Sequence, residues 1–348
     1  MGWSRVKRAA ILILKVALPA ALFAFLLWRV PQNDYDAFWS RPKRWDRLAL
    51  AQLLAVAAVT LGMVRWWALV RAFGIPFRLV EALRLGFLGY LLNFVSLGSV
   101  GGDLFKAILV AKGKPQARPE AVASVVLDRA IGMLGLVLLA VVSLTIFPTD
   151  ELPTVLRRIR QFALLLSIGA VVSLLLAIYS GNWFERWIVW LSQWPVVGEP
   201  LARMVWAVRL LRGQSLTLLA LILTAVVVHF LLTLTVYFVS CGLYPEHPSL
   251  AEHLYVVPPG MAAGAIPLAP GGLGAQEFAL DELFKQLPNQ PAEFSGIIVA
   301  TVYRLITLAI AGIGLLYYWT SQGRELQLAR AEAEVLAHQS NPPAAAGN

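Results

Sequence analysis

Residues 268–278 read LAPGGLGAQEF, and they interrupt a chain of unusually apolar composition. Pro270, three glycines and the carboxylate of Glu277 lie between long hydrophobic runs. Hydrophobic residues make up 59% of the 348 residues, charged residues only 14%, and the mean hydropathy is +0.70. These values are typical of a polytopic membrane protein. If the flanking runs lie in a bilayer, this stretch is a break between membrane segments and not an ordinary surface loop.

The apolar runs are long enough to cross a membrane, because a spanning helix needs about 20 mostly apolar residues. Six segments meet this requirement: Ala9–Trp28, Leu48–Val70, Val122–Phe147, Phe162–Tyr179, Leu216–Val239 and Ser295–Trp319. Two more, around Leu79–Gly98 and Leu254–Leu268, are broken by glycine, proline or charge. We therefore expect an all-α polytopic membrane protein with six transmembrane helices and two re-entrant or broken helical hairpins. A count of eight full spans is the alternative.

The pattern of residues 268–278 occurs twice in the chain. Both copies have the same order: a broken apolar segment, glycines, an acid and, further on, an arginine inside an apolar span. The first copy contains Gly101, Gly102, Asp103 and Arg129, and the second contains Gly271, Gly272, Gly274, Glu277 and Arg304. The acid and the arginine are 26 residues apart in the first copy and 27 in the second. This agreement indicates an internal repeat.

The number of spans between the two copies predicts their relative orientation. Three predicted spans separate the broken segments, and three is odd, so the second copy would enter the membrane from the opposite face. Inverted repeats of this kind are common in transporters, whose binding sites form near mid-membrane from discontinuous helices. We expect one membrane domain over residues 1–322, with repeat halves at about 79–147 and 252–320.

The distribution of basic residues predicts the topology. With the N-terminus in the cytoplasm, most Lys and Arg residues fall on the cytoplasmic side, as the positive-inside rule requires. We expect a multi-pass protein of the plasma or inner membrane with both termini cytoplasmic, and a partly disordered tail at residues 323–348. Arg65-Trp66-Trp67, near a span end, is interpreted as an interfacial anchor.

The repeated motifs also resemble a known family. NFVSLGSVGGD at residues 93–103, VLDR at 126–129 and PLAPGGLGAQE at 267–277 together look like the lysylphosphatidylglycerol synthase transmembrane (flippase-like) family. The resemblance extends from the first span to Trp319. In the best-known members this membrane unit moves an aminoacylated phospholipid between leaflets, while a separate soluble domain attaches the amino acid. The 348 residues have no room for that domain, so the resemblance implies a lipid-transport class without synthase activity.

The candidate site consists of polar groups that are costly inside a bilayer. An ionised side chain at its centre costs at least about 2.5–3.5 kcal/mol, so Arg129 and Arg304 need partners. Asp103 and Glu277 are the expected ones, and each arginine meets either the acid of its own half or that of the other. The arginines suit a lipid phosphate, because guanidinium donates two hydrogen bonds at once to phosphate oxygens; the alternative is that they only lock helix packing. Substrate-binding candidates are Asn93, Gly101, Gly102, Asp103, Asp128, Arg129, Gly271, Gly272, Gly274, Glu277 and Arg304.

Several other classes of site are not indicated. The glycines lack the Gly-Lys-Ser/Thr of a nucleotide-binding loop, and the scattered histidines and single cysteine do not indicate a metal site. The net charge of +9 comes without a nucleic-acid motif, and anionic lipid headgroups explain it. We therefore expect no cofactor and no metal, with membrane lipids as partners.

Three functions fit these observations. The leading hypothesis is a flippase- or scramblase-like transporter that moves a phospholipid, or a related anionic, aminoacylated or glycosylated lipid, through a polar cavity built by the two glycine-rich segments. The alternatives are a membrane-embedded enzyme acting on lipid headgroups or polyprenyl phosphate, and an accessory subunit of a lipid-modifying enzyme. The absence of a nucleophile–base or metal-ligand constellation in the sequence disfavours the enzyme.

Overall fold

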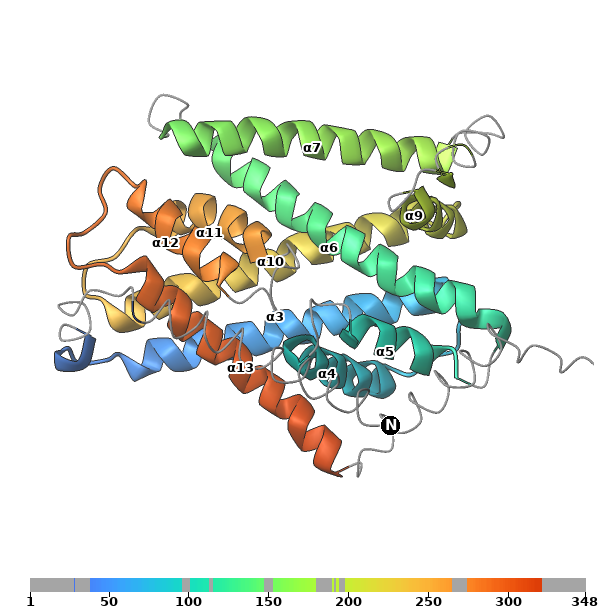
Figure 1. Cartoon of the computed structure of the whole chain (residues 1–348), viewed down its shortest axis with the longest axis horizontal. Coiled ribbons are helices and arrows are strands. Elements are labelled where there is room, and N and C mark those ends of the chain that lie inside the picture. Colours follow the sequence, from blue (N-terminus) through green and yellow to red (C-terminus); the bar gives the residue numbers. More distant parts are fainter. Residues whose placement is uncertain are drawn as a thin grey trace, which may run out of the picture.

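The computed structural model describes residues 28, 38–95, 101–112, 115–146, 153–179, 190, 192–193, 198–264 and 274–320. Helices account for the regular secondary structure of these parts (Figure 1). The predicted first span, apart from Trp28, and the predicted tail lie outside the described residues.

Five helices of the described chain are long and apolar enough to cross a membrane. They are α3 (Trp45–Ala72), α6 (Arg118–Ile146), α7 (Thr154–Tyr179), α10 (Ser215–Leu243) and α13 (Gly296–Thr320). Each contains, or nearly contains, one of the predicted spans. The predicted all-α polytopic membrane class is therefore confirmed.

The antiparallel pair α3 and α10 runs side by side through the bundle (Figure 1). At one end the backbone N–H of Arg44 donates to the carbonyl of Gly242 over 3.0 Å. At the other end the side-chain amide of Gln214 donates to the carbonyl of Ala72 over 3.2 Å. A Cβ atom at Gly242 would lie 2.7 Å from a methyl carbon of Leu48, so glycine lets the Leu48 side chain pack directly on α10.

The two broken segments form helical hairpins. The first consists of α4 (Leu79–Val95) and α5 (Gly101–Val110), and the second of α11 (Leu250–Gly264) and α12 (Ala275–Lys285). The two helices of each hairpin pack against each other. A Cβ atom at Gly102 would lie 2.1 Å from the carbonyl oxygen of Gly89, so α5 approaches α4 closely only because this residue is glycine.

The helix order α3–α4–α5–α6 recurs as α10–α11–α12–α13 with the same packing. Within the halves, α3 packs on α4, α4 on α5 and α5 on α6, as α10 packs on α11, α11 on α12 and α12 on α13. Between the halves, α4 packs on α13 and α11 on α6. Each half therefore also includes the long helix before its hairpin, which the pattern of acids and arginines did not reveal.

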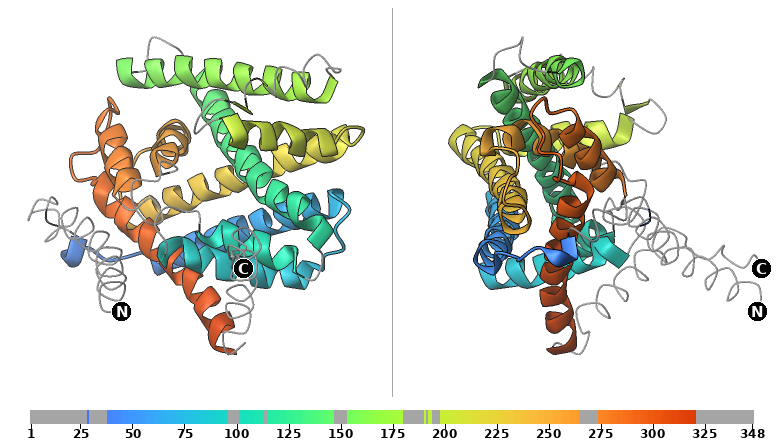
Figure 2. Two further views of the ribbon diagram at one scale, coloured as in Figure 1. Left: turned by 45° about the vertical axis from the view of Figure 1, so that its right-hand side comes forward. Right: turned by 90° about the vertical axis from the view of Figure 1, so that its left-hand side faces the viewer.

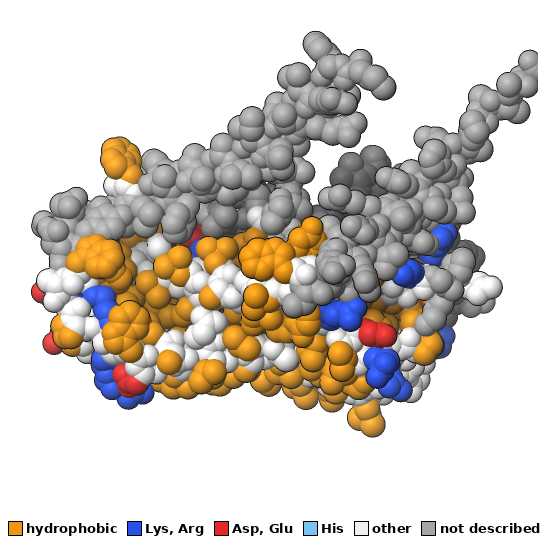
Figure 3. Space-filling view, turned by 90° about the horizontal axis from the view of Figure 1, so that it is seen from below, with side chains coloured by type: hydrophobic (Ala, Val, Ile, Leu, Met, Phe, Trp, Pro, Cys, Tyr) orange, Lys and Arg blue, Asp and Glu red, His pale blue; other side chains and the backbone are white. Residues whose placement is uncertain are grey.

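The remaining helices lie at the edge of the bundle. α7 contacts α6 and the shorter α9 (Gly198–Leu210), and a 3-10 turn at Pro115–Ala117 precedes α6 (Figure 2). In Figure 3 hydrophobic side chains cover the middle of the described surface, while charged side chains gather toward its two ends. A bilayer-spanning protein needs this arrangement, because its apolar middle surface faces the lipid tails and its charged ends face water.

Candidate functional site

The second half contains a fully buried ion pair. Glu277, the third residue of α12, accepts a hydrogen bond from Nε of Arg304 over 2.5 Å. The two side chains are only 2% and 4% exposed. The second carboxylate oxygen accepts the backbone N–H of Gly274 over 2.8 Å, and Arg304 Nη2 donates to Gln276 Oε1 over 3.3 Å. The polar groups of the second hairpin are therefore hydrogen-bonded within the second half itself.

Gly274 sets the start of α12. Its φ is +88°, a conformation that residues with a Cβ rarely adopt. This turn places Glu277 in the first turn of the helix, where the exposed N–H groups favour a negative charge. The last glycine of LAPGGLGAQEF therefore directs the acid toward Arg304.

The first half contains the matching pair in a more open setting. Asp103, the third residue of α5, accepts a hydrogen bond from Nε of Arg129. The Arg129 side chain is 41% exposed, while that of Asp103 is 14% exposed. The other carboxylate oxygen of Asp103 lies 4.0 Å from Nζ of Lys106, one turn further along α5. Asn93 Oδ1 accepts the backbone N–H of Gly102 over 3.2 Å and so joins the two helices of this hairpin.

Each arginine therefore pairs with the acid of its own half. Arg129 lies about 17 Å along α6 from its first residue, and Arg304 about 12 Å along α13, at 1.5 Å per residue. The two helices begin at opposite ends of the bundle. Val70, near the end of α3, shares a hydrophobic cluster with Ala121 at the start of α6. Phe294, just before α13, contacts Tyr244 at the other end of α3, where α10 finishes. The two ion pairs therefore lie at comparable distances from opposite ends of the helix bundle.

A third ion pair, which the sequence did not predict, joins α3 to α6. Arg65 Nε donates to Asp128 Oδ1 over 2.9 Å, and Arg65 Nη2 donates to the Asp128 backbone carbonyl over 3.3 Å. The side chains are 8% and 17% exposed. The interpretation of Arg65-Trp66-Trp67 as an interfacial anchor is therefore wrong for Arg65 and Trp66, which are buried inside the bundle.

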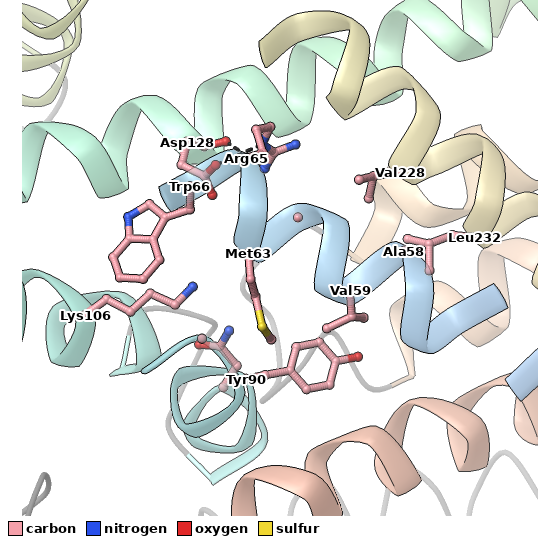
Figure 4. A pocket seen from close by; sticks show the side chains of 13 residues that line it. Ala58, Val59, Met63, Arg65, Trp66, Tyr90, Lys106, Asp128, Val228 and Leu232 are labelled. Carbon is pink, nitrogen blue, oxygen red and sulfur yellow. Dashed lines mark hydrogen bonds and ion pairs between the residues drawn. The ribbon is translucent and has the colours of Figure 1, made fainter. Parts of the chain in front are cut away.

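A cavity of about 170 Å³ lies beside this third pair (Figure 4). Helices α3, α4, α5, α6 and α10 all contribute to its wall. Its charged lining residues are Arg65, Lys106 and Asp128. The remaining lining residues are Ala58, Val59, Gly62, Met63, Trp66, Gly86, Tyr90, Asn93, Val228 and Leu232. In Figure 4 the Lys106 ammonium points toward the interior of this space, under the ring of Trp66.

The predicted site residues fall into three groups. Asn93 and Asp128 line the cavity. Asp103 and Arg129 do not line it, but Asp103 contacts the lining residue Lys106 and pairs with Arg129. Glu277 and Arg304, with Gly274, form the separate buried network of the second half. Gly102 provides the close approach inside the first hairpin, and Gly101 begins α5. Gly271 and Gly272 lie outside the described residues.

Two functional candidates were missed by sequence reasoning. Lys106 was not among the predicted site residues, but its position three residues after Asp103 places both on one face of α5. This spacing could have indicated from the sequence that Lys106 lies beside Asp103. Arg65 is separated from Asp128 by 63 residues and follows no motif, so only its position inside an apolar run hinted at a buried role.

A serine–histidine contact lies at the far end of α10. Ser240 Oγ and His253 Nε2 are 2.8 Å apart, and His253 Nδ1 faces the carbonyl of Ser249 over 2.9 Å. Because a carbonyl only accepts, Nδ1 carries the proton and Nε2 accepts from the serine. Both side chains are fully buried and neither lines the cavity described above, so this contact stabilises the junction of α10 and α11. Among the described residues no group of three or more His, Cys, Asp and Glu side chains is placed to hold a metal ion.

Comparison with protein families identifies the family of this chain. The family described as the lysylphosphatidylglycerol synthase TM region matches residues 12–314. No curated protein and no solved structure matches the chain.

Proposed function

We propose that this chain, which belongs to the lysylphosphatidylglycerol synthase transmembrane family, moves a lipid between the leaflets of its membrane. The membership makes it a membrane protein of lipid metabolism or transport. The finer proposal is a flippase- or scramblase-like movement of a phospholipid, or of a related anionic, aminoacylated or glycosylated lipid. The cavity beside Arg65 and Asp128 would take the headgroup, while the acyl chains stay in the surrounding lipid.

The observation that carries this proposal is a charged cavity inside the membrane domain. The Arg65–Asp128 pair lies about 10 Å from the last residue of α3 and about 15 Å from the first residue of α6, measured along the helices. Charged groups at this depth are costly, and in membrane proteins they mark pathways for polar substrates. A lipid headgroup crossing the bilayer needs such groups to replace its hydration.

The position of the hairpins supports a transport pathway. Two broken helices inserted from opposite ends of an inverted repeat are the arrangement in which transporters form their central sites. We propose that both hairpins are re-entrant. The first would line the headgroup cavity, and the second would hold the other half of the bundle in place.

A cavity-filling substitution tests the proposal without removing a charge. Gly62 lies on the cavity wall, and a Cβ atom there would meet nothing within 4 Å. Gly62→Leu would therefore fill the space while keeping the helix, since glycine costs about 0.8–1.0 kcal/mol relative to alanine inside a helix and leucine ranks close to alanine. Gly169→Leu is the matched control, because Gly169 is equally unobstructed but lies on the exposed face of α7.

The assay uses purified protein in vesicles that contain headgroup-labelled phospholipid. Quenching of the outer leaflet reports movement of label between leaflets. We expect accelerated movement with the unmodified chain and with Gly169→Leu, and at least about a tenfold loss with Gly62→Leu at unchanged thermal stability. No acceleration across anionic, zwitterionic and glycosylated lipids would refute transport. Covalently altered lipid, detected by mass spectrometry, would instead indicate an enzyme.

A further inference from the structure

Among the residues that the structure describes, the charges around the cavity do not cancel. Its lining contains two cations, Arg65 and Lys106, and one anion, Asp128. Extending the set to the neighbouring Asp103–Arg129 pair adds one charge of each sign, so the excess of one positive charge remains. An excess charge in this setting is costly unless a ligand supplies the opposite charge.

Lys106 carries most of this excess. Asp128 receives two hydrogen bonds from Arg65, one to its carboxylate and one to its backbone carbonyl. Asp103 forms a long ion pair with Lys106, at 4.0 Å, and its other oxygen is already bonded to Arg129. The Lys106 ammonium otherwise lies 5.2 Å from the centre of the Trp66 ring. Its side chain is 17% exposed, so water compensates little of its charge.

The size of the cavity limits what part of a lipid it accepts. At about 170 Å³ it is similar to an engineered protein cavity of about 150 Å³ that binds benzene. It therefore accommodates a headgroup-sized fragment and not a whole lipid. A phosphate suits the lining, because the ammonium of Lys106 acts as a point charge and the guanidinium of Arg65 donates directionally to oxygen.

We propose that the cavity selects an anionic lipid headgroup, whose phosphate binds between Lys106 and Arg65, and that it disfavours a headgroup with net positive charge. This inference rests on the proposed function for its setting, and it narrows the cargo. A lysylated phospholipid carries extra ammonium groups, which the excess positive charge repels. The phosphate of a plain anionic phospholipid neutralises it.

The test compares three probes in one binding experiment: phosphatidylglycerol, phosphatidylcholine and lysylphosphatidylglycerol. Purified protein is washed in detergent with each lipid, and retained lipid is measured by native mass spectrometry. We expect phosphatidylglycerol to be retained most and lysylphosphatidylglycerol least. Lys106→Gln is expected to weaken retention of phosphatidylglycerol about 10- to 100-fold, the range for loss of one hydrogen bond to a charged group, and to leave phosphatidylcholine nearly unchanged.

Two further variants keep the test decisive. Lys106→Arg preserves the charge and should restore the preference for phosphatidylglycerol. Lys112→Gln removes the same charge from an exposed position just beyond α5 and should change nothing. Stronger retention of lysylphosphatidylglycerol by the unmodified chain, or equal effects of Lys106→Gln on all three lipids, would overturn the inference. Selective binding without transbilayer movement would instead contradict the proposed transport and leave the anion preference standing.

Discussion

Removing the arginine from each of the two matched ion pairs should have very different consequences. Arg304 and Glu277 are 4% and 2% exposed, so Arg304→Met leaves a carboxylate buried without its main partner. Breaking a buried pair in this way costs about 3–5 kcal/mol of folding free energy. Arg129 is 41% exposed, and Asp103 keeps a second cation, Lys106, at 4.0 Å, so loss of this open pair should cost only about 0–1 kcal/mol. Arg129→Met should therefore leave the fold nearly intact.

The expected difference is measurable by thermal unfolding in detergent. At about 2–4 °C per kcal/mol for larger domains, Arg304→Met should lower Tm by about 6–20 °C. Arg129→Met should lower it by no more than about 4 °C. Fluorescence-detected size exclusion after heating gives both values from small amounts of protein.

A double substitution identifies the cause of the loss. Glu277→Leu combined with Arg304→Met removes both charges, and replacing a buried pair by apolar residues is often neutral. The double variant should therefore recover much of the Tm lost in Arg304→Met. Equal losses for Arg129→Met and Arg304→Met, or a double variant no more stable than the single one, would refute the reasoning that burial distinguishes the two half-sites.

Three further predictions concern the hairpin, the third ion pair and a loop histidine. Gly102→Ala should destabilise the first hairpin by about 1–3 kcal/mol, because the new Cβ atom would lie 2.1 Å from a carbonyl oxygen of α4. Cysteine cross-linking between α4 and α5 should then become less efficient, and cross-linking as efficient as in the unmodified chain would contradict this packing. Asp128→Asn should lower stability by leaving the Arg65 guanidinium uncompensated, and Arg65→Met in the same chain should restore part of it in thermal unfolding; no recovery would argue against the pair. Hydrogen bonding to the Cys241 thiol raises the pKa of His247 above its ordinary value of about 6.5. Protonated His247 therefore stabilises the fold below that pH, and this stabilisation is lost as the pH rises through the raised pKa. Tm should fall between about pH 6 and 8, and His247→Gln should flatten that change, whereas an identical pH profile in the variant would exclude the histidine as its cause.

The hydrophobic pattern was enough to predict most of the described helices. Five predicted spans correspond to long helices, because an apolar run of about 20 residues has few alternatives in a bilayer. The hairpins were readable because glycine and proline interrupt the runs. The spacing of 26 and 27 residues between acid and arginine reflected a real geometry, since each acid begins a short helix that packs beside the helix carrying its arginine.

The charged cavity was much less visible in the sequence. The Arg65–Asp128 pair joins helices that are distant along the chain, and no periodicity relates the two residues. Arg65 lies near the end of its apolar run, where an anchor in the headgroup layer is the commoner outcome. The packing of α6 against α3 decided otherwise, because it places a carboxylate within hydrogen-bond distance of the guanidinium.

Composition and spacing were enough to predict a helical membrane domain with two broken, oppositely inserted segments and an acid and an arginine in each half, because those features are local. Tertiary structure alone decided that the two pairs are unequal. Close packing of α11 and α12 buries Glu277 with Arg304, while the first hairpin leaves Arg129 open and directs Lys106 into a cavity. The physical reason is that burial and net charge depend on which helices meet. Helices that meet from distant parts of the chain leave no local trace in the sequence.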